Sequence, residues 1–489
     1  MESMEKLRGI VKKTIGNKQF MLLSYREPYT HYYDKDEVKW RKNPGGLVTA
    51  LDPVMRVCGG TWIACGANGA DMETADEKGC VGVPPGSPAY TLRRAWLTKE
   101  EESSYLMGAS NSALWPLCHV VYVRPHFNEE EWAVYRQVNE RFADMVLEEM
   151  KGESAFVWIQ DYQLALCAKY IKKKSPESVV AQFWHIPWPS AETFKICPWH
   201  REIVEGLLAN DLLGFHIRYY AQNFLESVDQ SVEARVDREH NSVFFRDLET
   251  KVMEFPVGID AGVVRKASEA ISDARIAEVK KRHGIGADRI LLGVSRLDYT
   301  KGIVEGLSAF QKFLEQNPQY QKKVSFVQIT SPSRTYLSEY EEVQDNVLRM
   351  SEEINWKYGS GRWKPVVLID EFTEFEDLVT FYKMADVCIV NSLHDGMNVV
   401  AKEYVSANND GDGMLVLSKF TGAARQLTSA LLVNPFSTDE VSAAIKTALE
   451  MPEAERKARM KRLLESVTEQ DVYAWAGAFI EKLAKIDGK

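Results

Sequence analysis

Two cations lie close together in one loop in the second half of the chain. Arg296 and Lys301 occur in the stretch VSRLDYTKG, directly after the apolar run ILLGV and just before a helical pattern that begins at Ile303. Ligands bind at the carboxyl ends of strands in open α/β sheets, and two cations beside a helix start favour a dianion such as a pyrophosphate. The alternative is a surface ion pair between Arg296 and Asp298 beside a solvated lysine.

A second loop presents groups that can hold anions and hydroxyls. The stretch NSLHDGMNVVAKEYV (391–405) follows the apolar run DVCIV and opens a helical pattern. The backbone N–H groups of residues 396–398 can meet an oxyanion at the helix start, and Asp395 and Glu403 can accept hydrogen bonds from sugar or ribose hydroxyls. A capped helix start is the alternative, but the two loops together favour a nucleotide-diphosphate ligand.

The first half of the chain adds a strand end and a glycine pair. Arg26 follows the apolar run FMLLSY, and Gly45 and Gly46 lie in a loop beyond it. Glycine lets the backbone approach a phosphate closely, although a plain turn would use the same residues.

Two further polar residues follow buried apolar runs. Asp161 comes after AFVWI, and His185 lies near the end of VVAQFWHI, with Trp184 and Trp188 beside it. Aromatic faces and a few polar groups position sugars, so this pattern suits a carbohydrate site. A histidine that is satisfied within the core is the alternative.

Composition limits the classes of partner. A net charge of −10 argues against nucleic acid and anionic membrane as partners. The seven cysteines are scattered and never spaced CxxC, so free thiols in a reducing cytoplasm are expected. Neither a signal peptide nor a membrane helix is expected. The histidines lack metal-ligand spacing and no GxGxxG follows a strand, so neither metal nor cofactor is expected.

Length and pattern predict two domains. A chain of 489 residues is too long for one hydrophobic core and suits two domains of about 200 residues each. Strand-like runs alternate with amphipathic helical stretches, which predicts parallel sheets with helices on both faces. The stretch 228–250 is expected to be irregular and KVMEFPVGID (251–260) to be a hinge. We therefore expect doubly wound α/β domains over 1–257 and 258–470, facing each other across a cleft.

Strands and one helix are specified more closely. Strands are expected at 20–25, 155–159, 179–186, 211–217, 290–294, 324–330, 365–370 and 386–390. A helix is expected over GIVEGLSAFQKFLEQ, where apolar residues recur at helical spacing from Ile303 to Leu314.

Six motifs resemble those of one glycosyltransferase family. VSRLDYTKG, NSLHDGMNVVAKEYV, SNSALWP, WIQDYQL, FWHIPWPS and EGLLANDLLGFH are similar to motifs of trehalose-6-phosphate synthase and its relative glucosylglycerol-phosphate synthase. The resemblance runs from about Phe20 to Trp475. It implies a retaining transferase of the GT-B fold, with two Rossmann-like domains and a C-terminal helix (471–489) that crosses back to the first domain.

The same resemblance implies which residues bind the donor. Arg296 and Lys301 would neutralise the donor pyrophosphate, and Gly45 and Gly46 would lie near a donor phosphate. The transferred glucosyl unit and the ribose would be held by Asp395, Gly396, Met397, Asn398, Val399 and Glu403.

Catalytic and acceptor-binding residues are implied in the same way. Asp161 and His185 would flank the reacting carbon and the acceptor hydroxyl, beside the cations Arg296 and Lys301. The acceptor and its phosphate would be bound by Arg26, Trp115, Asp161 and Arg334. A tyrosine of the family aligns with Leu106, and Tyr105 is the neighbouring candidate for its role.

The chain departs from the family pattern at several positions. It has Gln160 and Gln163 where the family usually reads HDYH, and His394 where the family reads RDGMN. The stretch IDEFTEF (369–375) does not match the usual base-binding loop. The resemblance implies UDP-glucose as the donor, and because this loop departs from the family, ADP- and GDP-glucose stay as alternatives.

The expected activity is transfer of glucose to a phosphorylated acceptor with retention. Glucose 6-phosphate is the expected acceptor and glycerol 3-phosphate the alternative. Two other classes stay open: a GT-B phosphorylase with pyridoxal phosphate on a lysine, and a sugar-phosphate sensor without catalysis. A homo-oligomer is a further open alternative.

Overall fold

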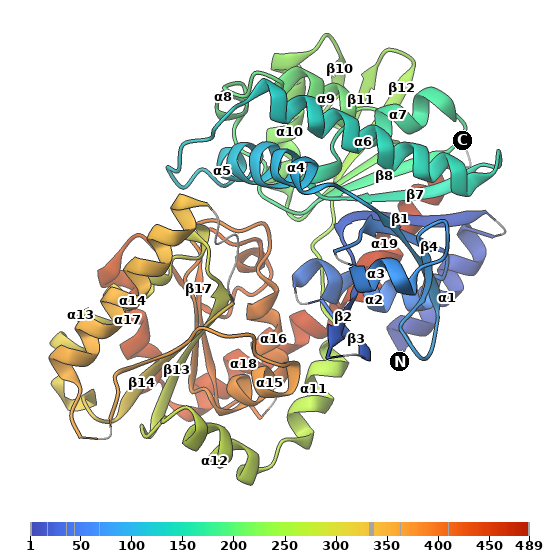
Figure 1. Cartoon of the computed structure of the whole chain (residues 1–489). Helices are drawn as coiled ribbons and strands as arrows, with labels where there is room; N and C mark the ends of the chain where they lie inside the picture. The colour runs from blue at the N-terminus through green and yellow to red at the C-terminus, as the bar shows by residue number, and fades with distance from the viewer. Residues whose placement is uncertain are drawn as a thin grey trace. The chain divides into compact units, whose positions relative to one another are not determined.

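The computed structural model describes residues 2–16, 18–35, 37–43, 45–67, 69–331, 337–361, 363–408 and 410–487. The chain forms two compact units (Figure 1). Unit 1 spans Met1–Gly258 and Val472–Lys489, and unit 2 spans Ile259–Asp471. Each unit has a sheet with parallel strands joined by helices, which confirms the expected α/β class.

The sheet of unit 1 has the strand order β10-β11-β12-β9-β8-β7-β1-β4-β6-β5. The pairs from β12 to β6 are parallel, and β5, β10 and β11 join the two ends in antiparallel pairs. The strand bounds are β1 Gln19–Arg26, β4 Thr61–Cys65, β5 Cys80–Val83, β6 Tyr90–Ala95, β7 Ala155–Gln160, β8 Val179–Trp184, β9 Leu212–Phe215, β10 Arg235–Asp237, β11 Ser242–Phe245 and β12 Leu248–Glu254.

The strand order of unit 1 reverses beside β1. After β1 the chain adds β4 and β6 on one side, and it later adds β7, β8 and β9 on the other side. The gap between β1 and β7 is therefore a topological switch point, where open α/β sheets bind ligands at the carboxyl ends of their strands. Arg26 and Gln160 end these two strands, and Asp161 follows directly.

The helices of unit 1 include the C-terminal one. They are α1 Glu2–Thr14, α2 Gly46–Cys58, α3 Gly69–Thr74, α4 Lys99–Glu102, the π-helix η1 Ser103–Leu114, α5 Trp115–His119, α6 Glu129–Met150, η2 Tyr162–Leu164, α7 Cys167–Lys174, α8 Ala191–Phe194, α9 His200–Leu207, α10 Arg218–Ser231 and α19 Val472–Asp487. Helix α19 packs on α1, α2 and β8. Its Phe479 stacks on Trp158 of β7, with ring centroids 4.6 Å apart.

Two regions of unit 1 differ from the sequence predictions. The stretch 228–250 is not irregular, because it contains the end of α10, strands β10 and β11 and the start of β12. Residues 251–254 of the expected hinge end β12 and pair with β9. A hairpin of β2 (Tyr29–Asp34) and β3 (Glu37–Lys42) also precedes the glycine pair. β3 has four charged residues among its six, and β2 mixes tyrosines with polar residues, so neither strand forms a continuous apolar run.

The sheet of unit 2 has the strand order β15-β14-β13-β16-β17-β18, with every neighbouring pair parallel. The chain adds β14 and β15 on one side of β13 and then β16, β17 and β18 on the other, so the switch point lies between β13 and β16. The bounds are β13 Arg289–Arg296, β14 Val324–Ser331, β15 Val366–Ile369, β16 Val387–Val390, β17 Met414–Ser418 and β18 Leu431–Val433.

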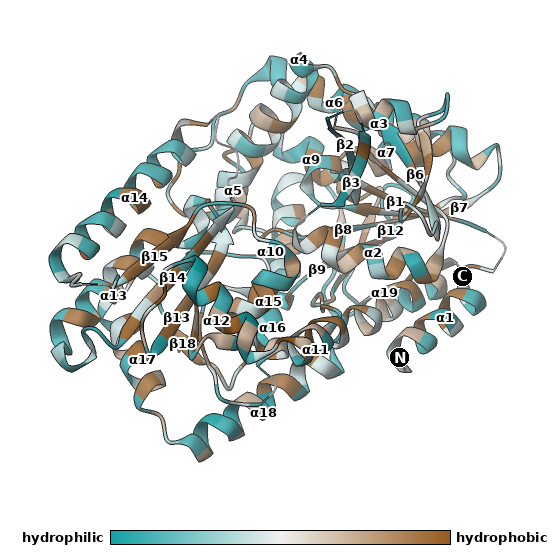
Figure 2. Ribbon diagram, turned by 60° about the horizontal axis from the view of Figure 1, so that its bottom comes forward, coloured by the Kyte–Doolittle hydropathy of each residue, from teal (hydrophilic) through white to brown (hydrophobic). Residues whose placement is uncertain are grey.

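The helices of unit 2 surround a core of apolar side chains from both element types. They are α11 Ala261–Ala270, α12 Asp273–Arg282, η3 Tyr299–Lys301, α13 Ile303–Gln316, η4 Pro318–Tyr320, α14 Ser338–Tyr358, α15 Phe375–Met384, α16 Val399–Ala407, η5 Gly422–Arg425, α17 Thr438–Glu450 and α18 Glu453–Glu469. Phe310 and Phe313 of α13 join Phe326 of β14 in this core. In Figure 2 strands β13, β14 and β15 are mostly brown and α14 is mostly teal.

The expected strands and the expected helix are confirmed. The eight strand predictions correspond to β1, β7, β8, β9, β13, β14, β15 and β16, and the helix prediction corresponds to α13. Parallel strands are buried on both faces, so they read as continuous apolar runs. Within the described residues, no helix combines the length and apolar composition needed to cross a membrane.

Candidate active site

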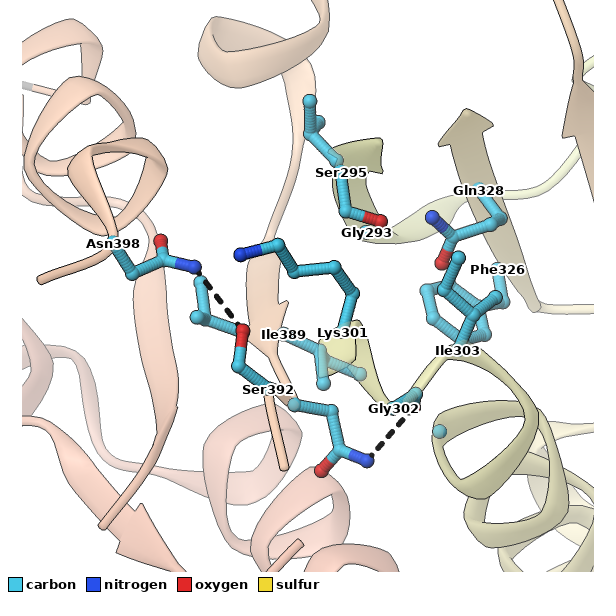
Figure 3. A pocket seen from close by; sticks show the side chains of 14 residues that line it. Gly293, Ser295, Lys301, Gly302, Ile303, Phe326, Gln328, Ile389, Ser392 and Asn398 are labelled. Atoms are coloured by element: carbon cyan, nitrogen blue, oxygen red, sulfur yellow. Dashed lines mark hydrogen bonds between the residues drawn. The ribbon is translucent and has the colours of Figure 1, made fainter. Parts of the chain in front are cut away.

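The carboxyl edge of the unit 2 sheet holds a pocket at its switch point. The pocket lies at the ends of β13, β14 and β16 and the start of α13, and Figure 3 shows side chains that line it. Polar groups on its wall come from Ser295, Lys301, Gln328, Asn391, Ser392 and Asn398. Both cation-bearing and anion-cradling loops of the sequence analysis therefore meet here, as the parallel topology requires.

An ion pair joins these two loops. Lys301 Nζ lies 2.6 Å from Asp395 Oδ2, although 94 positions separate the residues in sequence. Asn398 Nδ2 donates to the same carboxylate oxygen at 3.1 Å, and it also lies 3.3 Å from Ser392 Oγ. Both ion-pair side chains are largely buried, with exposures of 11% for Lys301 and 14% for Asp395. In Figure 3 Lys301 and Asn398 point toward one another.

Two backbone features give these loops their shape. Gly302 has φ of 62°, and a Cβ added there would lie 2.2 Å from Asn391 O, so no other residue fits without a shift. Asn398 has φ of 74° and caps α16, because its Oδ1 accepts from Ala401 N at 3.2 Å. The Asn391 amide donates to Gly302 O at 3.0 Å and fixes one loop to the other.

The remaining residues of the second loop are placed at the start of α16. Asp395 N donates to Phe420 O at 3.0 Å, and Met397 O accepts from Ala423 N at 2.8 Å. Gly396 lies against Gly422, and Val399 is the first residue of α16. The loop 395–398 is therefore held by neighbouring backbone, as a preorganised ligand site requires.

Arg296 is paired, but not as a simple surface salt bridge. Its Nη2 lies 3.6 Å from Asp298 Oδ2, and its side chain is 36% exposed. Asp298 is fully buried and also accepts from Thr300 N and Thr300 Oγ1, at 3.0 and 2.9 Å. The buried carboxylate therefore holds the strand-end loop that carries both Arg296 and Lys301.

Glu403 lies in the second turn of α16. Tyr382 donates its hydroxyl to Glu403 Oε2 at 2.8 Å. Burial raises the pKa of the Glu403 carboxyl from 4.5 to about 7, and the hydrogen bond from Tyr382 partly offsets this. Its neighbour Lys402 is buried, with a pKa lowered to about 7, and donates to Gln426 Oε1 at 2.6 Å.

The switch point of unit 1 brings together Arg26 and the glycine pair. Arg26 ends β1 and is exposed, and a Cβ added at Gly45 would lie 3.8 Å from Arg26 Nη1. Gly45 caps the N-terminus of α2, and Gly46 begins that helix. The cap makes no side-chain hydrogen bond and the first turn has no acidic residue. Helix starts of this kind favour anions.

Asp161 and His185 are held together at the ends of β7 and β8. Asp161 has φ of 66°, and its Oδ1 accepts from the backbone N of His185 at 3.1 Å. The His185 ring lies with Nε2 2.8 Å from Gln160 Oε1. Burial lowers the pKa of His185 from 6.5 to about 3, so its ring is neutral near pH 7.

The residues predicted to bind the acceptor differ in how deeply they are buried and in what they contact. Trp115 is largely buried at the start of α5 and packs on His119, with ring centroids 3.9 Å apart. Tyr105 is fully buried in η1 and donates its hydroxyl to Gln163 O at 2.9 Å, so this hydroxyl is already used within the protein. The next residue, Leu106, is half-buried. Arg334 lies outside the described residues.

Some site residues were not anticipated from the sequence. Gln160 was noted only as a departure from the family pattern, and Ser392 and Asp298 had no assigned ligand role. The contact of Gln160 with His185 follows from strand register, which places Gln160 beside Phe183 of β8. Within the described part of the chain, no group of three or more His, Cys, Asp or Glu side chains is arranged to hold a metal ion.

The sequence of this chain matches the model of one protein family. The model named Glycosyltransferase family 20 matches residues 18–485. The chain belongs to glycosyltransferase family 20. This match confirms the sequence resemblance, and it covers nearly the whole length of the chain.

Two similar relatives of this family 20 chain are named trehalose-6-phosphate synthase. A trehalose-6-phosphate synthase of Mycolicibacterium gilvum is 38% identical over 474 residues, which cover 95% of this chain and 93% of the relative. A trehalose-6-phosphate synthase of Mycobacterium avium is 36% identical over 488 residues, with 98% of each chain covered.

Solved structures of the family share the fold. An E. coli structure bound with UDP-2-fluoro glucose superposes with a TM-score of 0.85 at 29% identity, covering 95% of this chain and 99% of that one. An α,α-trehalose-phosphate synthase (UDP-forming) of Burkholderia xenovorans in complex with glucose-6-phosphate gives 0.86 at 28% identity, with 95% and 99% covered. The expected GT-B class is thereby confirmed.

Proposed function

We propose that this family 20 chain is a trehalose-6-phosphate synthase. It transfers the glucosyl group of UDP-glucose to the anomeric hydroxyl of glucose 6-phosphate and releases UDP. The family match over residues 18–485 carries this proposal. The matched region includes the switch-point strands of both units, so both candidate sites belong to one enzyme family. The names of relatives at 36–38% identity over nearly the whole chain support the same substrate pair.

Unit 2 binds the donor in this proposal. Arg296 and Lys301 face the diphosphate, whose two negative charges match two cations at one strand end. Asp395, the backbone of residues 396–399 and Glu403 hold the hydroxyls of the glucosyl unit and the ribose. The switch-point pocket between β13 and β16 supports this assignment.

Donor binding exchanges one partner of Lys301. Without donor, the ion pair at 2.6 Å keeps the Lys301 and Asp395 side chains from being unpaired in a largely buried place. When donor binds, Lys301 moves to the diphosphate and Asp395 accepts a hydrogen bond from a sugar hydroxyl. Asn398 and Ser392 already contact the Asp395 carboxylate and hold it in position during the exchange.

Unit 1 binds the acceptor. Arg26 and Arg334 take the acceptor phosphate, and Trp115 and Asp161 position the sugar. Gly45 and Gly46 take a donor phosphate at the start of α2, where no side chain bonds to the first backbone N–H groups and the helix start favours an anion. The buried hydroxyl of Tyr105 argues against the acceptor contact that the sequence alignment allowed.

The reaction is a front-face displacement with retention. The bond from the anomeric carbon of the donor to the diphosphate oxygen breaks, and the acceptor oxygen bonds to the same face of that carbon. The acceptor proton passes to the leaving diphosphate. Arg296 and Lys301 stabilise the charge that grows on the diphosphate, and Asp161 and His185 position the reacting groups.

A donor and acceptor panel tests this function. UDP-, ADP- and GDP-glucose are each combined with glucose 6-phosphate or glycerol 3-phosphate, and nucleotide release and phosphorylated disaccharide are measured. We expect the highest kcat/KM for UDP-glucose with glucose 6-phosphate. A preference for glycerol 3-phosphate would show the glucosylglycerol branch instead, and binding of both ligands without product would show a sensor.

Two expectations are left as predictions. We expect a cytoplasmic protein, which localisation of the tagged chain in cells tests. The alternative of a homo-oligomer is tested by sedimentation of the purified chain.

A further inference from the structure

The side chain of Gln160 forms a hydrogen bond with the ring of His185, the proposed catalytic histidine. It ends β7 as a fully buried residue, and its Oε1 lies 2.8 Å from His185 Nε2. Its own Nε2 is buried with no hydrogen-bond partner among the described residues. The Gln160 side chain therefore makes one hydrogen bond, and that bond goes to the His185 ring.

The other side of the His185 ring is open to a ligand. His185 is half-buried, and no described residue forms a hydrogen bond with its Nδ1. The backbone of His185 is fixed independently, because its N donates to Asp161 Oδ1 at 3.1 Å. The ring is thus held at one nitrogen by Gln160 and leaves the second nitrogen for substrate.

The groups around the His185 ring bear on which of its two nitrogens carries the proton. Phe183 packs on the His185 ring at 4.6 Å between centroids, and His216 and Trp475 lie at 5.3 and 6.5 Å. The Asp161 carboxylate accepts from the His185 backbone N at 3.1 Å. A neutral imidazole donates through one nitrogen and accepts through the other, so a partner at one nitrogen decides the role of both.

We propose that Gln160 is a positioning residue that holds His185 in the tautomer with its proton on Nε2. The Gln160 carbonyl accepts from Nε2–H, and Nδ1 is then an acceptor for a hydroxyl of the sugar substrate. This inference rests on the proposed function, in which His185 contacts substrate. An amide cannot titrate, so the assignment holds over the whole pH range in which the ring is neutral.

The tautomer is measured directly by NMR. Protein with 15N-labelled histidine rings is prepared, and the His185 signals are assigned by comparison with His185→Gln. We expect Nε2 protonated and Nδ1 unprotonated in the wild type, and an increased Nδ1–H population in Gln160→Leu, where the buried carbonyl is gone. A protonated Nδ1 in the wild type, or an unchanged tautomer in Gln160→Leu, would overturn the proposal.

Kinetics supply a second readout. In Gln160→Glu a carboxylate replaces the amide, accepts from Nε2–H at high pH and stabilises the imidazolium at lower pH. We expect kcat/KM near that of the wild type at high pH and a new acidic limb, because protonated Nδ1 can no longer accept. Gln163→Glu adds the same charge three positions away and is the matched control. An equal acidic limb in the control, or no new limb in Gln160→Glu, would overturn the proposal.

The NMR result does not depend on turnover. If the wild type made no disaccharide phosphate, the proposed function would fail while the tautomer of His185 could still be read. If the wild type is active but the tautomer does not respond to Gln160, only the positioning role fails.

Discussion

At the scale of single residues, Arg296 carries the clearest prediction. In the proposed mechanism it faces charge that develops on the leaving diphosphate, and one such group is worth roughly 3 kcal/mol, or about two orders of magnitude in rate. We expect Arg296→Ala to lower kcat about 100-fold with a smaller change in donor KM. Arg289→Ala at the other end of β13 is the matched control, since Arg289 pairs with Asp386 away from the pocket. A raised KM with unchanged kcat would mean that Arg296 only binds donor.

Glu403 predicts a pH dependence of donor binding. Its pKa is raised by burial to about 7, so the carboxylate is mostly protonated at pH 6 and mostly ionised at pH 8. An ionised carboxylate is the better acceptor for ribose hydroxyls, so donor KM should fall about tenfold from pH 6 to pH 8. Gln at this position can still accept from Tyr382, so Glu403→Gln should give a flat profile. A wild-type donor KM that is constant over this range would contradict the assignment.

Variants at Tyr105 and Leu106 test which of the two positions contacts the acceptor phosphate. Tyr105 is buried and bonded to Gln163 O, so Tyr105→Phe should lower stability by about 1 kcal/mol and leave the acceptor KM unchanged. A phenol at the half-buried position 106 could donate to the acceptor phosphate, and such a bond is worth about 1.5–3 kcal/mol, or roughly 10- to 150-fold. Leu106→Tyr should therefore lower the KM for glucose 6-phosphate. A large loss of acceptor affinity in Tyr105→Phe would reverse these roles.

At the scale of elements, two glycines near Asn391 provide a matched pair. A Cβ at Gly302 would lie 2.2 Å from Asn391 O at φ of 62°, whereas a Cβ at Gly306 would have its nearest neighbour at 3.8 Å. Gly302→Ala should destabilise the protein by about 2–5 kcal/mol. Gly306→Ala, within α13, should stabilise it by about 0.5–1 kcal/mol. Denaturant unfolding of both variants tests this, and equal midpoints would show that the tight turn is absent.

The sequence predicted strands that read as apolar runs, the edge strand β15 among them, but not the exposed hairpin strand β3. Strands such as β7 and β8 are buried throughout, so they appear as apolar runs. Every residue of β3 is exposed, and it contains four charged residues among its six, so its sequence lacks a strand pattern. Hairpins of this kind are stabilised by their pairing and by packing of one end, which periodicity does not reveal.

The candidate site was predictable by position and less so by contact. Arg296, Lys301 and Asp395 were placed because strand ends of a parallel sheet meet at one edge. The hydrogen bond from Gln160 to His185 depends on the register of β7 and β8, which sequence alone does not fix. The orientation of Tyr105 was also beyond prediction, because it lies in the π-helix Ser103–Leu114, whose turns do not follow the period of 3.6 residues.

At the scale of the whole molecule, the two cations predict independence from divalent metal. In the proposed mechanism Arg296 and Lys301 provide two positive charges for the diphosphate, which is the role that a divalent ion has in many other transferases. We expect turnover to be unchanged after EDTA treatment and gel filtration. Loss of activity that magnesium restores would contradict the view that these side chains suffice.

The central claim concerns which bond the enzyme makes. The most direct measurement is NMR of the product formed from glucose 6-phosphate and UDP-glucose labelled with 13C at the anomeric carbon. We predict that the label appears in an α-linked anomeric carbon joined through oxygen to the anomeric carbon of the unlabelled glucose 6-phosphate, with one UDP released for each linkage. A label found in a β linkage or in free glucose would contradict the assignment as a retaining trehalose-6-phosphate synthase.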